Sequence, residues 1–251
     1  MDAYVGDWRI GSWLFQRGLA AIYLIAFVVA LNQFPALLGE HGLLPVPAFV
    51  SQISFVQAPS LFQFVYSDRL LRLVAWTGII LAGAILAGLL ERLPWWALSA
   101  AWLVLYGLYL SIINVGQTFY AFGWESMLAE AGFFAAFLGP ATVKPSLIPM
   151  LALRWMLFRL MLGGGLIKLR HDPCWRDLTC LDFHFETQPL PNPLSWYFHH
   201  LPEPLLKGGV LFNHLVEVIA PFGLLGPQPV AAAAGVLFIV HQLLLIVSGP
   251  E

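Results

Sequence analysis

Long apolar stretches separated by short polar or proline-containing connections dominate the pattern of hydrophobic and polar positions. At a rise of 1.5 Å per residue, about 20 apolar residues match a hydrocarbon core about 30 Å thick. Six stretches have this length, at residues 14–34, 70–90, 95–115, 150–169, 208–225 and 230–248. The pattern predicts an all-α fold, a polytopic transmembrane helical bundle.

A seventh, weaker stretch at residues 124–138 is of marginal length and carries Glu125 and Glu130. It is either a short buried span or a re-entrant helix, and both need protein or water around the carboxylates. With seven crossings, the long loops 35–69 and 170–207 share one side of the membrane. Lysine and arginine are nearly equal in number on the two sides, so the positive-inside rule does not orient the chain.

The composition supports a single membrane-embedded domain over residues 1–251. Hydrophobic residues make up 59% of the chain and charged residues 10%, whereas a soluble domain carries about 25% charge. The first apolar stretch is too long for a cleaved signal peptide, so it is expected to remain as a helix. With a net charge of −2 and no basic stripe, the expected partner is the lipid bilayer and not nucleic acid.

Both cysteines of the chain, Cys174 and Cys180, lie in the second long loop. A disulfide would place this loop on the non-cytoplasmic side, in an oxidising compartment. Two free thiols are the second alternative. The third is a Cys₂His₂ zinc site with His171 and His184, but its spacing is not a common zinc-finger pattern. The disulfide is the favoured alternative, and no metal is expected.

The same loop carries dense polar chemistry, which predicts an ordered non-cytoplasmic cap over residues 170–207. Its charged and aromatic residues either form a binding surface or pair with one another and fasten the loop to the bundle. The loop motif consists of Asp172, Trp175, Arg176, Asp177, Asp182, His184, Glu186 and Gln188.

Three polar residues of the sixth stretch are expected on one side of a helix, because Asn213 and Glu217 are four residues apart and His214 and Glu217 are three apart. His241, in the last stretch, could face them across a hairpin. Polar groups in hydrocarbon are functional candidates, here for proton transfer or for binding a quinone-like headgroup. The favoured alternative is that these groups form hydrogen bonds that hold the helices together.

Four sequence motifs, GLIKLR, DPCWRDLTCLD, HFETQPLPNPLSWY and NHLVEVIAPF, closely resemble the lipase maturation factors. The resemblance implies a membrane protein that, in animals, helps secreted dimeric lipases to fold in the endoplasmic reticulum, with no known catalytic step and no cofactor. The family continues beyond Ser248 into a C-terminal domain associated with client binding, so that domain is expected to be absent. The Ala- and Gly-rich composition looks bacterial, which would mean the bacterial inner membrane and another secreted client.

A fainter resemblance, carried by GGGLIKL, is to the vitamin K-dependent gamma-carboxylase, where a lysine in a membrane pocket acts as a base. This resemblance would make Lys168 the base of a membrane enzyme, with His214 and Glu217 as further catalytic residues. A low-dielectric site disfavours a charged ammonium and so suits proton abstraction. In the ordinary alternative, which is favoured here, Lys168 and Arg170 extend to the lipid headgroups.

Small residues recur at Gly163–Gly165 and between Gly78 and Gly88. They favour close helix packing, within the chain or in a homo-oligomer. From the two resemblances, a maturation factor is the favoured function, and a membrane enzyme with Lys168 as base is the alternative.

Overall fold

The computed structural model describes residues 8–187 and 192–249, and all regular elements in this part of the chain are helices. Six helical segments are long and apolar enough to cross a membrane: Trp8–Leu38, Asp68–Leu86, Trp96–Val115, Leu147–His171, Glu203–Gly223 and Gln228–Ser248. They coincide with the six predicted stretches, so the prediction of a polytopic helical membrane protein is confirmed.

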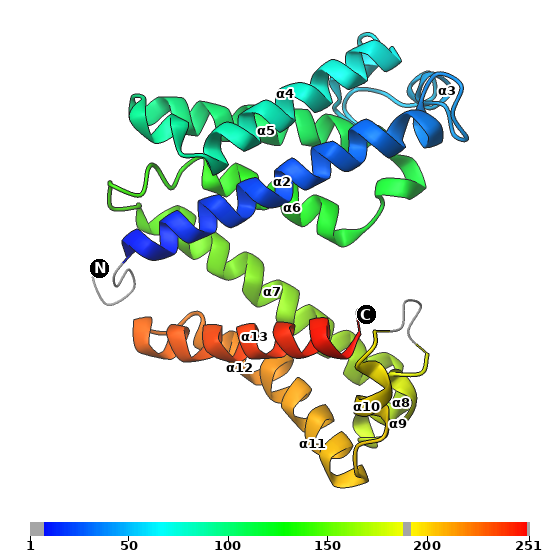
Figure 1. Cartoon of the computed structure of the whole chain (residues 1–251), viewed down its shortest axis with the longest axis vertical. Coiled ribbons are helices and arrows are strands. Elements are labelled where there is room, and N and C mark those ends of the chain that lie inside the picture. Colours follow the sequence, from blue (N-terminus) through cyan, green and yellow to red (C-terminus); the bar gives the residue numbers. More distant parts are fainter. Residues whose placement is uncertain (1–7, 188–191, 250–251) are drawn as a thin grey trace. The chain divides into compact units, whose positions relative to one another are not determined.

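Two compact units make up the chain, Asp7–Met150 and Leu151–Glu251, where the sequence analysis treated residues 1–251 as one domain. They are called here the N-terminal and the C-terminal unit, and each is described by itself. In the N-terminal unit the long helices α2 and α4 run side by side, and α6 packs on α5 (Figure 1). The helices of this unit are α2 (Trp8–Leu38), α3 (Val46–Val50), η1 (Leu61–Gln63), α4 (Asp68–Leu86), η2 (Leu89–Arg92), α5 (Trp95–Val115), η3 (Gln117–Tyr120) and α6 (Gly123–Ala135).

Aromatic side chains form the centre of the N-terminal unit. The ring of Tyr23 meets those of Trp102 and Tyr109 edge to face, with centroids 5.8 and 5.5 Å apart, a favoured geometry for aromatic pairs. Tyr23 also donates a hydrogen bond to the carbonyl of Leu128 at 2.9 Å, which fastens α6 to α2. The rings therefore join α2 to α5, the hydrogen bond joins α2 to α6, and the one polar group of Tyr23 is satisfied inside the unit.

Helix α6 has 13 residues, which corresponds to about 20 Å of helix. It falls short of the roughly 30 Å of a hydrocarbon core and is not among the six candidate spans. The hydroxyl of Tyr109 donates a hydrogen bond to Glu125. The half-buried Glu125 carboxylate thus has a partner within the protein, which either interpretation of this segment allows.

Both ends of α4 are fixed by polar groups. The hydroxyl of Ser67 accepts a hydrogen bond from the amide of Leu70 at 3.1 Å and so caps the first turn. At the other end, Arg17 of α2 donates to the carbonyl of Leu86 at 2.9 Å and pairs with Glu91 at 2.8 Å. Gly88 follows with φ of 76°, in the left-handed region that glycine adopts without strain.

The C-terminal unit is built from the long helix α7, the broken helix α11 to α12, and α13. Its apolar core includes Phe158 of α7, Val216 of the broken helix and Phe238 of α13. The helices of this unit are α7 (Leu147–His171), α8 (Pro173–Arg176), α9 (Leu181–His184), α10 (Ser195–His199), α11 (Glu203–His214), η4 (Leu215–Ile219), α12 (Ala220–Gly223) and α13 (Gln228–Ser248).

The segment η4 is one turn of π-helix, and Glu217 lies in it. In a regular α-helix, the amide of residue 221 would donate to the carbonyl of residue 217, but Pro221 has no N–H to donate. The missing donor explains why the α-helical bonding is interrupted here. Single π-turns inside helices are frequent at functional sites, so η4 is a candidate location for such a site.

Candidate functional site

Four buried polar side chains from three helices form a continuous hydrogen-bonded network, the polar cluster, which consists of Lys168, Asn213, Glu217 and His241. The Nζ atom of Lys168 lies 2.9 Å from Glu217 Oε1 and 3.2 Å from Asn213 Oδ1. Asn213 donates through Nδ2 to Glu217 Oε2 at 3.0 Å. His241 donates through Nε2 to Asn213 Oδ1 at 2.9 Å.

The contacts of Lys168 contradict the expectation that its head extends to the lipid headgroups. Its side chain is 15% exposed and that of Glu217 is 9% exposed. A buried carboxylate and a buried ammonium are each costly, and pairing with further hydrogen bonds offsets that cost. The ion pair with Glu217 therefore determines the position of the lysine head.

Close packing of α7 against η4 brings this pair together. A Cβ atom added to Gly165 would lie 2.9 Å from Cβ of Glu217 and 2.8 Å from a methyl group of Val218. Neither distance is tolerable without movement of a neighbour. The predicted close approach at the triple glycine is confirmed at Gly165, whereas a Cβ on Gly163 would meet nothing within 4 Å.

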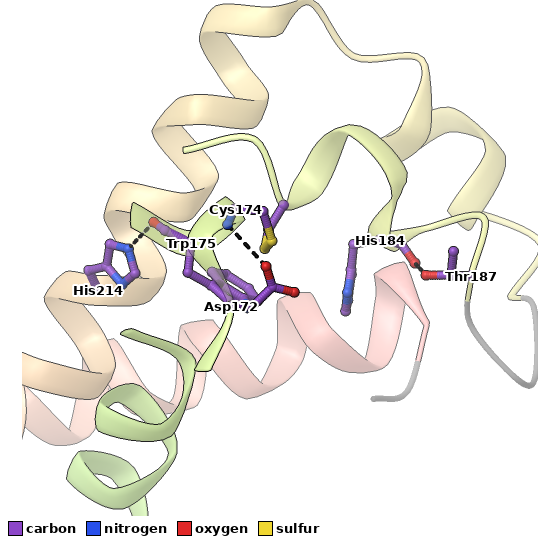
Figure 2. Close-up of a disulfide and its surroundings, with 7 residues drawn as sticks. Asp172, Cys174, Trp175, His184, Thr187 and His214 are labelled. Carbon is purple, nitrogen blue, oxygen red and sulfur yellow. Dashed lines mark hydrogen bonds between the residues drawn. A yellow bond between two sulfur atoms is a disulfide. The ribbon is translucent and has the colours of Figure 1, made fainter. Parts of the chain in front are cut away.

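His214 takes a different direction from the one expected. Its Nε2 donates to the backbone carbonyl of Trp175 at 2.8 Å, as Figure 2 shows. His214 therefore links α11 to the cap, and the polar cluster does not include it. Lys168 Nζ lies 4.8 Å from the centroid of the Trp175 ring, within the range of a cation–π contact.

The cap contains a disulfide between Cys174 and Cys180, whose Cα atoms are 4.7 Å apart. The carboxylate of Asp172 accepts a hydrogen bond from the amide of Cys174 at 3.1 Å and so caps α8 (Figure 2). Between the cysteines, Leu178 has φ of 61°, which is unusual for a residue with a branched side chain. Because both thiols are used, the Cys₂His₂ zinc alternative would require the disulfide to be reduced.

The other residues of the loop motif are distributed between the surface and the interior of the cap. Arg176, Asp177 and Glu186 are exposed, and Glu186 lies 3.1 Å from a ring nitrogen of His199. Asp182 and His184 are half-buried. Gln188 lies outside the described residues.

A cavity of about 300 Å³ lies between part of the cap and the helices α11 and α13. Sequence analysis did not predict it, although the aromatic run at residues 196–200 was a signal of an amphipathic segment. Asn213 and His241 of the polar cluster line the cavity, together with Trp175 and His184 of the cap. The remaining lining is apolar apart from Ser248 and includes Leu181, Phe185, Phe198, Leu206, Phe212 and Leu245.

The existing hydrogen bonds of the polar groups limit the chemistry that this site can perform. The ammonium of Lys168 donates to two acceptors, and Lys168 does not line the cavity. A lysine can act as a general base only as a neutral amine that lies within hydrogen-bond reach of its substrate. This arrangement fits a group that holds α7, η4 and α13 together better than it fits a base, while the cavity offers an apolar space with a small polar end.

Comparison with known proteins supplies the family. Residues 10–250 match the family model described as the lipase maturation factor transmembrane domain. Human lipase maturation factor 1 is 40% identical over 269 residues, which cover 98% of this chain and 46% of the relative. Lipase maturation factor 2 of Xenopus laevis is 35% identical over 242 residues, with 87% of this chain and 33% of the relative covered.

This chain spans less than half the length of these relatives. No solved structure matches it. The family model nevertheless covers nearly all of the chain, including the cap and the polar cluster. The chain therefore belongs to the lipase maturation factor family, and the part described here corresponds to the transmembrane domain of that family.

Proposed function

We propose that this chain is a membrane-embedded maturation factor that assists the folding of secreted proteins. The observation that carries the proposal is the match to human lipase maturation factor 1 along 98% of the chain. That relative's name describes the maturation of lipases. We assign the same general role, the maturation of a secreted protein, to this chain, and the experiment below tests a lipase as the client.

The cap supports the proposal in two ways. Its disulfide is a bond that persists in oxidising compartments, which are the compartments in which secreted proteins fold. Its surface carries exposed aromatic side chains, with Trp196 at 62% and Tyr197 at 63% exposure. Exposed aromatic groups of this kind contribute strongly to protein interfaces, so the cap is the surface on which we place client contact.

The alternative, an enzyme with Lys168 as base and with His214 and Glu217 as further catalytic residues, has less support. Its favourable feature is a polar cluster that adjoins a cavity. Against it stand the ion pair of Lys168 with Glu217 and the bond of His214 to the Trp175 carbonyl. Neither contact directs its group toward a substrate in the cavity.

A secretion assay tests the proposed function. The chain is expressed in human cells that lack lipase maturation factor 1, together with a secreted dimeric lipase. A second sample carries a chimera in which the C-terminal remainder of the human relative follows residue 251. We expect the chimera to restore lipase activity in the medium, measured per unit of lipase protein in the cell.

Variants locate the surface responsible. The pair Trp196→Ala and Tyr197→Ala in the cap should lower the restored lipase activity several-fold. Trp76→Ala, which removes an exposed aromatic ring from the span α4, is the matched control and should leave it unchanged. A chimera that reaches the membrane at normal abundance but restores no activity would overturn the proposal.

A further inference from the structure

The cavity under the cap combines a long apolar lining with a buried polar end. Asn213 and His241 are both almost completely buried, whereas Leu205 and Leu244, which also line the cavity, are exposed. The exposed leucines lie on α11 and α13, which are candidate membrane spans. The cavity thus runs from polar groups inside the unit to apolar surface of the kind that contacts lipid.

Two side chains at the polar end, Asn213 and Trp175, are hydrogen-bond donors with N–H groups left over. Asn213 Nδ2 carries two N–H groups, and within the described part of the chain it donates only to Glu217. The amide oxygen of Asn213 is occupied by Lys168 and His241. The indole N–H of Trp175, a group that can only donate, also has no acceptor among the described residues, and Trp175 lines the cavity. A ligand that satisfies these groups must offer oxygen acceptors.

We propose that the cavity binds one fatty acid, with its carboxyl oxygens at Asn213 and Trp175 and its chain directed past Leu205 and Leu244. The volume of about 300 Å³ is at the lower end of the range of about 300–1,000 Å³ for small-molecule sites. A single chain with a compact head suits this space better than a phospholipid headgroup does. Because Lys168 neutralises Glu217, no unpaired anion of the cluster repels the carboxyl group.

The proposal goes beyond the maturation role and does not depend on it. Its test uses the full chain, purified in detergent, and a photoreactive, alkyne-tagged palmitic acid. We expect labelling of peptides from α11 and α13. An excess of oleic acid should suppress the labelling, whereas hexadecane, which has the chain but no oxygen, should suppress it far less. The same photoreactive chain built into phosphatidylcholine should label these peptides weakly.

A matched pair of variants on one helix tests the location. Leu245 lines the cavity and Leu243, two residues away on α13, does not. Leu245→Trp should reduce labelling about tenfold, equivalent to 1.4 kcal/mol, and Leu243→Trp should leave it unchanged. Equal labelling of the two variants would overturn the site.

The competition results decide the ligand class without any variant. Equal competition by hexadecane and oleic acid would overturn recognition of the carboxyl group. Equal labelling by the phosphatidylcholine probe would mean that the cavity accepts any acyl chain, which contradicts a fatty acid site. Suppression by oleic acid alone supports the proposal even where Leu245→Trp fails to fold.

Discussion

At the scale of single residues, Glu217 is the side chain on which the polar cluster depends. Its two carboxylate oxygens accept hydrogen bonds from Lys168 and Asn213, and His241 Nε2 lies 4.0 Å from Oε1. A buried charge without its partner costs much more than the pair contributes when it is intact. The cluster is therefore sensitive to the loss of any one member.

Removal of the Lys168 ammonium tests this dependence. Lys168→Met should lower the free energy of unfolding by about 3–5 kcal/mol, because it leaves the Glu217 carboxylate buried without its cation. Thermal unfolding in detergent, followed by circular dichroism, measures the effect. The double variant Lys168→Met with Glu217→Gln should recover most of the loss, because no buried charge remains.

The control for Lys168→Met is the same substitution in an exposed pair. Lys207 and Glu203 lie four residues apart on α11, with Nζ and Oε1 2.5 Å apart, and exposed pairs contribute little. Lys207→Met should leave the unfolding temperature almost unchanged. Equal shifts for Lys168→Met and Lys207→Met would show that the buried cluster does not stabilise the unit.

Sequence reasoning identified much of this cluster because helical spacing is local. It placed Asn213 and Glu217 on one helix face and His241 opposite them, and the hydrogen bonds of the structure agree. The contacts of Lys168 and His214 were not predicted, because they depend on how distant segments of the chain pack. The direction of Lys168 depends on a carboxylate 49 positions later, and the partner of His214 is a backbone carbonyl in the cap.

At the scale of elements, the packing of α7 on η4 depends on one glycine of three. Gly165→Ala would place a methyl group 2.9 Å from Cβ of Glu217. Such overpacking costs about 1–3 kcal/mol, so we expect a lower unfolding temperature. Gly163→Ala meets nothing within 4 Å and, by helix propensity, should be neutral or stabilise by up to about 1 kcal/mol. If both variants unfold at the same temperature, α7 and η4 are not in close contact there.

The disulfide should hold the cap in the conformation that contacts α11. Closing a ring of this size in the unfolded state corresponds to about 2 kcal/mol in the chain-entropy model. The variant with Cys174→Ser and Cys180→Ser should therefore be cleaved faster by protease within the cap, detected by mass spectrometry of the fragments. Dithiothreitol should accelerate cleavage of the parent protein and have no effect on the variant. Identical cleavage of variant and parent would contradict this role.

The apolar pattern predicted the long helices well because length and hydropathy are properties of the chain itself. The π-turn at η4 was not predicted, although Pro221 was the available signal. The cavity was not predicted either, because it depends on how α9 and α10 fold back over α11. The 13 residues of α6 show why its length was ambiguous: the helix is too short for an ordinary span, yet it is packed inside a unit of spans.

At the scale of the whole molecule, the number of crossings and the location of the cap are linked. If α6 turned back, the cap would share a side of the membrane with Arg9, at the start of α2, and with Arg92, in the connection between α4 and α5. Because disulfides form in oxidising compartments, we expect the cap on the non-cytoplasmic side, where the positive-inside rule disfavours arginine clusters. If α6 crosses, the arginines are divided between the two sides. Local thinning of the bilayer can accommodate a short span at modest cost, so we expect seven crossings.

Single cysteines at three exposed positions test this topology in intact cells with a membrane-impermeant maleimide. We expect Asp177→Cys in the cap and Ser51→Cys in the first long loop to react from outside, and Arg92→Cys to react only after the membrane is opened. The parent protein should not react, because its two cysteines form the disulfide. Reaction of Asp177→Cys together with Arg92→Cys, but without Ser51→Cys, would mean that α6 turns back. In that case the cap would remain non-cytoplasmic, and the arginine distribution would need another explanation than the positive-inside rule.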